Sequence, residues 1–177
     1  MGWPTKFTLL YVGRLIPEKG VRLAIAVAKE FSSQVNLKII GSEGPEMEYV
    51  LNATATCANI EFLGRFSHHQ LAKYYQAADV LIYPALYQED MAYVLLDSLS
   101  CGTPGINTNP GSGVYRLPST VGFVVPPDLE SIVSKVKFLL SHPKNLASMS
   151  ASAAKFSKKF GPGLAKKITA VYDSLII

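Results

Sequence analysis

The alternation of short apolar runs with amphipathic segments is the feature that most constrains the fold of this chain. The apolar runs have the length and composition of buried strands, and they lie at residues 7–12, 37–40, 60–63, 79–83, 105–107 and 122–125. The segments with helical periodicity lie at residues 21–31, 46–58, 67–77, 91–100, 129–141, 145–158 and 164–176. Apolar strands that alternate with helices indicate a parallel sheet covered on both faces. The sequence therefore predicts a doubly wound α/β fold that ends in several helices.

Composition limits the chain to one core and to a narrow range of ligands. With 177 residues, of which 49% are apolar, it is long enough for one well-filled core and short for two. Its net charge is +4, and no dense run of Lys or Arg is present. This argues against a basic surface that binds nucleic acid, and the mild positive charge fits an acidic small molecule. Cys57 and Cys101 form no C-x-x-C pair, so we expect free thiols in a reducing cytoplasm. No apolar run approaches the roughly 18 residues of a membrane span.

Two acids, Glu89 and Asp97, stand eight positions apart around the expected start of helix 91–100. If one helix covered both, their backbones would be about 12 Å apart. Paired carboxylates that act on one glycosidic bond need a closer approach, of about 5–9.5 Å. The spacing suits the two ends of an elongated ligand such as a nucleotide-sugar, with an anion at the free N–H groups of the helix start. The competing interpretation is one acid that favours the helix dipole and one exposed helix acid.

The loop after the first strand is the strongest candidate for an anion site. Ligands of open parallel sheets bind at the carboxyl ends of the strands. There the chain reads Gly13-Arg14-Leu15-Ile16-Pro17-Glu18-Lys19-Gly20. Arg14 offers a planar fork and Lys19 a mobile point charge, both beside a helix start. A solvated turn in which Arg14 pairs with Glu18 is the competing interpretation.

Glycines and an arginine follow the next two strands. Gly41 and Gly44 would let the backbone approach a ligand closely, or would adopt a positive φ in a simple turn. Arg65 follows the third strand, either at a binding site or as a solvated side chain.

These stretches resemble the motifs of the retaining, GT-B-fold glycosyltransferases of group 1. Residues 13–20 are similar to the family's GRL-x-P-E-K-G loop, and residues 41–45 to its G-x-G-P turn. Residues 89–104 are similar to its E-x7-E acids and the EAMACGTP that ends them. The resemblance covers residues 11–172 and implies a Rossmann-like domain that binds a nucleoside-diphosphate sugar. It implies no cofactor and no metal.

The resemblance also implies a role for each matching residue. Arg14 and Lys19 would hold the diphosphate and neutralise it as the leaving group. Glu89 would hold the sugar hydroxyls and Asp97 the ribose hydroxyls, so that Glu89, Arg14 and Lys19 would be the catalytic residues. The remaining donor-binding residues, some through their backbone, would be Gly13, Gly41, Gly44, Arg65, Asp90, Met91 and Ala92.

The resemblance extends to one half of such an enzyme. Complete members carry a second, N-terminal domain that binds the acceptor. We therefore expect residues 6–177 to form the donor-binding domain, and residues 1–5 to be the remnant of a linker or an artificial extension. The chain would be a fragment or a separate subunit that is inactive without its other half. We expect it in the cytoplasm, with no nucleic-acid partner and with any membrane contact made through the missing half.

Several positions depart from the family pattern. Asp97 stands in place of Glu, Met91-Ala92 in place of Phe-Gly, and Gly105 in place of an apolar strand residue, while residues 111–116 lack the acid of a G-G-x-x-E loop. These departures favour the alternative of a catalytically degenerate binding or scaffold module. Two further alternatives are an epimerase or phosphorylase on the same fold, and another nucleotide binder. No G-x-G-x-x-G or P-loop supports the latter.

The histidines carry no recognisable motif. None of His68, His69 and His142 has a cysteine or a carboxylate at the spacing of metal ligands. We expect surface or capping histidines and no metal site.

Overall fold

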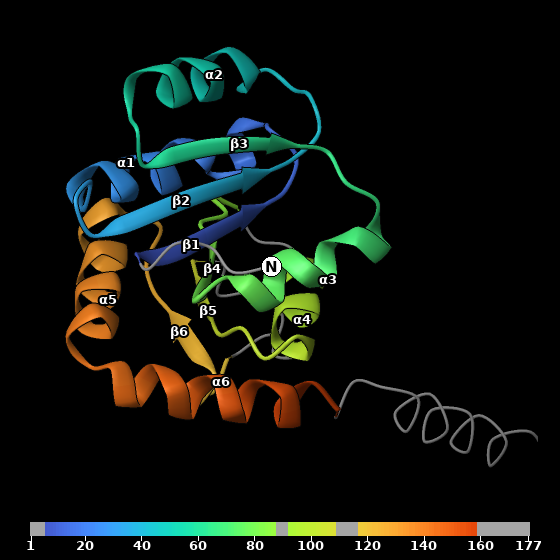
Figure 1. The fold of residues 1–177 in the computed structure, drawn as a ribbon, viewed down its shortest axis with the longest axis vertical. Helices are drawn as coiled ribbons and strands as arrows, with labels where there is room; N and C mark the ends of the chain where they lie inside the picture. Colours follow the sequence, from blue (N-terminus) through green and yellow to red (C-terminus); the bar gives the residue numbers. More distant parts are fainter. Residues whose placement is uncertain (1–5, 88–91, 109–116, 159–177) are drawn as a thin grey trace, which may run out of the picture.

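The computed structural model describes residues 6–87, 92–108 and 117–158. Within them the chain forms one six-stranded sheet in the order β3-β2-β1-β4-β5-β6, with all neighbours parallel (Figure 1). The strands are β1 Phe7–Val12, β2 Val35–Ile40, β3 Ile60–Gly64, β4 Val80–Tyr83, β5 Gly105–Asn107 and β6 Gly122–Val124. The predicted doubly wound α/β fold is confirmed.

Helices connect the strands and follow the last one. They are the 3-10 turn η1 Pro17–Lys19, α1 Val21–Glu30, α2 Met47–Thr56, α3 His68–Ala77, α4 Tyr93–Ser100, α5 Leu129–Ser141 and α6 Pro143–Ser157. The prediction for α5 is confirmed to the residue. Helix α6 begins two residues before the predicted start, because a proline suits the first turn of a helix. The helix predicted at 164–176 lies outside the described residues.

Two apolar cores cover the two faces of the sheet. Successive strand residues point to opposite faces, so Leu9 and Tyr11 of β1 join one core and Leu10 and Val12 the other. Helices α1, α2 and α5 supply the first core, whereas α3 and α4 supply the second. Helix α6 runs along the β6 side and contributes to both cores (Figure 1). Burial of each Leu or Ile side chain contributes about 1.5–3 kcal/mol.

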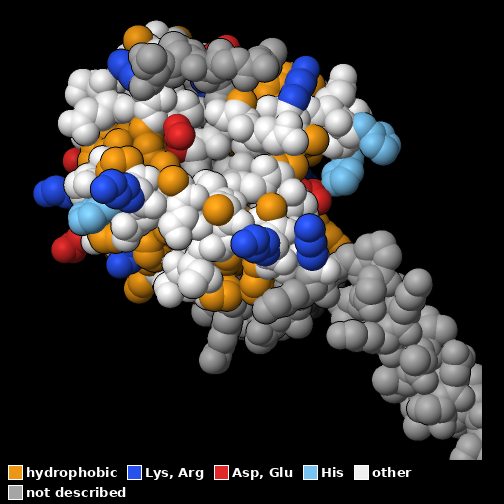
Figure 2. Space-filling view, turned by 60° about the horizontal axis from the view of Figure 1, so that its bottom comes forward, with side chains coloured by type: hydrophobic (Ala, Val, Ile, Leu, Met, Phe, Trp, Pro, Cys, Tyr) orange, Lys and Arg blue, Asp and Glu red, His pale blue; other side chains and the backbone are white. Residues whose placement is uncertain are grey.

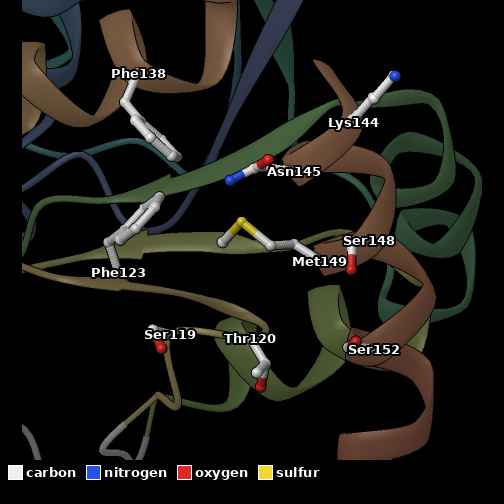
Figure 3. Close-up of a pocket in the computed structure, with 9 residues that line it drawn as sticks. All are labelled: Ser119, Thr120, Phe123, Phe138, Lys144, Asn145, Ser148, Met149 and Ser152. Carbon is white, nitrogen blue, oxygen red and sulfur yellow. The ribbon is translucent and has the colours of Figure 1, made fainter. Parts of the chain in front are cut away.

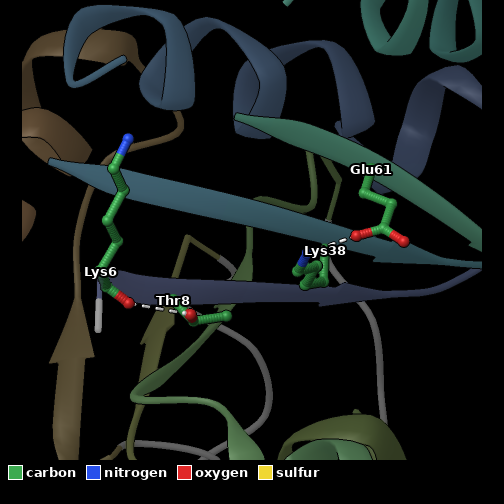
Figure 4. Close-up of polar contacts among 4 residues, drawn as sticks. All are labelled: Lys6, Thr8, Lys38 and Glu61. Carbon is green, nitrogen blue, oxygen red and sulfur yellow. Dashed lines mark hydrogen bonds and ion pairs between the residues drawn. The ribbon is translucent and has the colours of Figure 1, made fainter. Parts of the chain in front are cut away.

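Polar contacts set the register at the β3 edge and at the start of β1. Lys38 of β2 lies opposite Glu61 of β3, and their side chains form an ion pair (Figure 4). The Thr8 hydroxyl donates to the Lys6 carbonyl at 3.1 Å. The Thr8 backbone N–H donates to Asp79 Oδ2 at 2.7 Å, while the Asp79 N–H donates to the Thr8 carbonyl at 3.0 Å. These two bonds join the start of β1 to the residue before β4.

The order of connections reverses between β1 and β4. The chain winds from β1 outward to β3 and then returns to the other side of β1 as β4. Such a reversal opens a crevice at the carboxyl ends of the two adjoining strands, where doubly wound proteins bind ligands. The loops that leave β1 and β4 are therefore the place to look for a site.

Candidate functional site

The loops after β1 and β4 meet at the carboxyl edge of the sheet. The Leu86 N–H donates to the Glu18 carbonyl at 2.8 Å. Gly20 has φ 67°, and a Cβ at this position would lie 1.9 Å from the Pro84 carbonyl oxygen. Only glycine tolerates both this backbone conformation and this close approach. The local sequence thus brings the two predicted donor loops into direct contact.

Lys19 lies near two tyrosines, Tyr83 at the end of β4 and Tyr87 in the loop that follows it. Its Nζ donates to the Tyr83 hydroxyl at 3.2 Å, and it lies 5.6 Å from the Tyr83 ring centroid and 5.8 Å from that of Tyr87. Ring faces attract a cation at this range. The tyrosines were not predicted as site residues, although Tyr83 ends a predicted strand and its contact follows once β1 and β4 are neighbours.

Arg14 is exposed, and its side chain forms no ion pair with a described acid. The alternative in which it pairs with Glu18 is therefore wrong. The Arg14 carbonyl accepts a hydrogen bond from the Tyr11 hydroxyl at 3.0 Å, which fixes the backbone of this residue. The guanidinium remains available to a ligand.

Gly41 and Gly44 pack against the first loop. A Cβ on Gly41 would lie 2.3 Å from the Gly13 carbonyl oxygen, and one on Gly44 would lie 2.3 Å from the Leu15 carbonyl oxygen. Neither glycine has a positive φ, so close approach of the backbone is the feature that requires glycine here. Their lack of side chains lets the loops after β1 and β2 touch.

Two adjoining hollows open beside these glycines. One, of about 170 Å³, is lined at its polar side by Gly13, Gly41 and Arg65, and at its apolar side by Leu71 of α3. The other, of about 510 Å³, shares Gly41 and Arg65 and extends over Met47. Arg65 is exposed at the rim of both. The structure thus brings together Gly13, Gly41 and Arg65, three of the residues expected to bind the donor.

Asp97 meets a histidine that the sequence did not single out. His68, the first residue of α3, places Nε2 2.9 Å from Asp97 Oδ2 on α4. His68 is at the surface, as expected, but it has a carboxylate partner that its sequence neighbours do not reveal. The pair joins the start of α3 to the second turn of α4.

The spacing argument for Glu89 and Asp97 needs correction. Helix α4 begins at Tyr93, after Ala92, so one helix does not cover both acids and the separation of about 12 Å does not apply. Glu89, Asp90 and Met91 lie outside the described residues, as do residues 111–116. Ala92 is 3% exposed and its side chain belongs to the second apolar core.

The charge of Asp97 affects two nearby groups, the Tyr75 hydroxyl and the Cys101 thiol. Burial raises the pKa of Tyr75, and the charge of Asp97 raises it further. Burial and Asp97 likewise raise the pKa of the Cys101 thiol. The Tyr75 hydroxyl is buried and has no hydrogen-bond partner among the described residues. Both groups therefore stay protonated at neutral pH beside a charged carboxylate.

A separate hollow, of about 420 Å³, lies at the other end of β6 (Figure 3). Ser119 and Thr120, which precede β6, face Asn145 and Met149 of α6 across it, while the rings of Phe123 and Phe138 close one end. The predicted site residues do not line it. On the surface around α6, Lys and Arg side chains are interspersed with neutral and hydrophobic ones and form no stripe (Figure 2).

The described residues contain no cluster of three or more His, Cys, Asp or Glu arranged to bind a metal. Within the same part of the chain, no helix has the length and apolarity needed to cross a membrane.

The fold and site define a doubly wound α/β protein with a basic loop at its switch point and two hollows beside the carboxyl ends of β1, β2 and β3. The family model of the glycosyl transferases group 1 matches residues 2–156. The chain therefore belongs to the group 1 glycosyltransferases.

Individual relatives agree with this assignment. The chain is 30% identical over 144 residues to a GDP-mannose-dependent alpha-(1-6)-phosphatidylinositol dimannoside mannosyltransferase of Mycobacterium tuberculosis, over 80% of this chain and 37% of that protein. It superimposes on sucrose-phosphate synthase from Thermosynechococcus elongatus with a TM-score of 0.82 and 24% identity, over 97% of this chain and 46% of the other. For Anabaena HepE in complex with UDP, the TM-score is 0.83 with 17% identity, over 96% and 49%.

The comparisons also show how much of each relative the chain covers. It spans 35–39% of the length of the first curated relatives that it matches. The solved structures show the same fold, which is one half of a GT-B glycosyltransferase.

Proposed function

We propose that the chain is the donor-binding half of a retaining glycosyltransferase, which holds a nucleoside-diphosphate sugar for transfer to an acceptor bound elsewhere. The observation that carries the proposal is the contact between the loops after β1 and β4 at the switch point. This contact supports the proposal because Lys19 then stands beside the carboxyl ends of β1 and β4, the position at which doubly wound proteins bind ligands. Membership of the group 1 family supports sugar transfer as the reaction.

Lys19 and Arg14 would hold the diphosphate. The amine of Lys19 is a cationic donor that contacts the Tyr83 hydroxyl beside the loop after β4. The Arg14 guanidinium is exposed and adds a fork that can bind two phosphate oxygens. As the sugar leaves, negative charge grows on the diphosphate, and both cations stabilise it. Because two side chains neutralise this charge, the proposal needs no metal ion.

The nucleoside would occupy the hollows beside Gly13, Gly41 and Arg65. Backbone groups at Gly41 and Arg65 would face the base, Asp97 would accept from the ribose hydroxyls, and Glu89 would hold the sugar. Of the proteins named above, HepE is complexed with UDP and the mycobacterial mannosyltransferase depends on GDP-mannose, so a nucleoside diphosphate is the chemistry that these two share. The proposal therefore names a nucleoside-diphosphate sugar without choosing its base. We place this reaction in the cytoplasm.

The phosphate contacts can be tested by comparing ligands that differ in their phosphates. Loss of a charged hydrogen bond costs about 1.5–3 kcal/mol, so Arg14→Ala and Lys19→Ala should each weaken UDP or GDP about tenfold or more. Binding of uridine or guanosine should hardly change. Titration calorimetry measures both, and Lys29→Ala, which removes an exposed charge at the far end of α1, is the matched control.

Equal losses for the nucleoside and its diphosphate would refute the phosphate assignment. A large loss in the Lys29→Ala control would attribute the effect to net charge instead.

A second candidate is a donor-binding module without catalytic turnover. It is favoured by Ala92, whose buried Cβ stands where the family pattern has glycine. The two candidates differ in one result. A binding module would bind donor but transfer no sugar, even when its second half is supplied.

A further inference from the structure

The contact between His68 and Asp97 joins two helices beside the proposed nucleoside site. His68 begins α3, and Leu71, one turn later, lines the 170 Å³ hollow with Gly13 and Arg65. Asp97 lies in the second turn of α4. The Nε2–Oδ2 contact of 2.9 Å therefore fixes the carboxylate relative to the helix that forms a wall of the hollow.

The contact with His68 engages one of the two carboxylate oxygens of Asp97. A carboxylate accepts hydrogen bonds and does not donate, so Nε2 of His68 carries the hydrogen. Oδ2 is engaged by His68, whereas Oδ1 accepts no hydrogen bond from a described residue. The Asp97 side chain has an exposed fraction of 31%, so a ligand can approach it.

Two of the described groups near Asp97 are neutral. They are Tyr75 of α3 and Cys101, which follows α4, and both have a raised pKa for the reasons given above. The Nζ of Lys73, further along α3, lies 4.9 Å from the Tyr74 ring centroid. The ring of His69 lies 6.2 Å from that of His68, centroid to centroid, and no described carboxylate pairs with His69. His68 is thus the described side chain that hydrogen-bonds Asp97.

We propose that His68 is a positioning residue that holds Oδ2 of Asp97 so that Oδ1 accepts a hydrogen bond from a ribose hydroxyl. The inference rests on the proposed function, which places Asp97 at the ribose. Asp97 is one methylene shorter than the Glu of the family pattern, so its reach depends on one favourable rotamer. A contact that selects this rotamer before the ligand arrives reduces the ordering cost of binding.

The test compares ribonucleotides with nucleotides that lack both ribose hydroxyls. Titration calorimetry would measure the Kd of UDP and GDP, and of their 2′,3′-dideoxy counterparts, for the unaltered chain and for His68→Ala, His68→Gln, His69→Ala and Asp97→Asn. Because the pair is partly exposed, His68→Ala should weaken the ribonucleotides about threefold to fivefold. The dideoxy forms should bind as before.

The two companion variants separate positioning from a general effect of the helix. His68→Gln keeps an N–H donor on a side chain of similar reach and should restore most of the affinity for ribonucleotides. His69→Ala removes the adjacent exposed histidine on α3 and should change neither Kd. A merely structural role would weaken both classes of nucleotide and would not be rescued by Gln.

The outcomes distinguish this inference from the proposal on which it rests. If Asp97→Asn weakens ribonucleotides selectively and His68→Ala does not, the positioning role is overturned while the ribose role of Asp97 stands. If the unaltered chain binds ribonucleotides and dideoxynucleotides equally, or binds neither, the ribose role fails and the positioning role fails with it.

Discussion

At the scale of one residue, the Asp79 carboxyl group links the start of β1 to the residue before β4, and its contribution to stability depends on pH. Burial raises the pKa of its carboxyl group, and the hydrogen bond from the Thr8 N–H opposes the rise. A pKa that is higher in the folded than in the unfolded state means that the folded state binds the proton more readily. The stability contributed by the protonated form is present below the ordinary pKa and is lost as the pH rises through the raised pKa.

Asp79→Asn should therefore gain stability relative to the unaltered chain as the pH rises from about 4 to 7. Asparagine keeps an oxygen that accepts from the Thr8 N–H and removes the charge that burial disfavours. Urea unfolding across this range would measure the difference in unfolding free energy, with the exposed Glu48→Gln as control. A difference that stays constant, or that falls with rising pH, would contradict the assignment.

Some site residues could be predicted from sequence because neighbours in the chain carry the signal. Arg14 and Lys19 stand in one loop directly after a strand, and the structure places that loop at the switch point. The contact of His68 with Asp97 spans 29 positions and depends on how α3 packs against α4, so no local pattern announces it. The sequence likewise predicted Tyr83 as a strand residue but not its contact with Lys19, which is 64 positions away.

At the scale of elements, Gly20 decides whether the loops after β1 and β4 can meet. Gly20→Ala would place a Cβ 1.9 Å from the Pro84 carbonyl oxygen in a backbone with φ 67°. The left-handed conformation alone costs an L-residue about 1–2 kcal/mol. The clash adds to this, so the unfolding free energy should fall by more than about 2 kcal/mol. Nucleoside-diphosphate binding should weaken as well, because Lys19 precedes Gly20.

Gly64→Ala provides a matched control for this prediction. Gly64 also has a positive φ, of 84°, but a Cβ there would meet no atom within 4 Å. It should cost the backbone strain alone, which chemical denaturation would detect as a smaller loss. Equal losses in the two variants would show that contact between the loops does not depend on Gly20.

Most element positions followed from apolar patterning, whereas some ends did not. Strand β2 begins at Val35, two residues before the predicted start, because it pairs with Phe7 of β1 although the polar Asn36 interrupts the apolar run. Gly105 stands where an apolar strand residue was expected, and a Cβ there would lie 2.5 Å from Leu95 Cδ1. Tertiary packing sets both features, and neither is encoded in a local pattern.

At the scale of the whole molecule, the proposed function implies that the chain forms one wall of a site. It spans less than half of its curated relatives, and exposed apolar side chains stand on both sides of residues 88–91, at Leu86, Tyr87 and Tyr93. We expect the other half of the enzyme to cover this edge of the sheet. Closure of two halves orients the reactants and excludes water from the reacting bond.

The isolated chain should therefore bind a nucleoside-diphosphate sugar weakly and release almost no nucleoside diphosphate, with or without an acceptor. Joining it to an N-terminal acceptor-binding half should tighten donor binding and start turnover, because the second half completes the site. A nucleoside-diphosphate release assay over a panel of UDP- and GDP-sugars would measure both states. Arg14→Ala in the joined protein is the control that links turnover to the donor loop.

Robust, acceptor-dependent turnover by the isolated chain would contradict the half-enzyme proposal, whereas tight donor binding without turnover in the joined protein would favour the binding module.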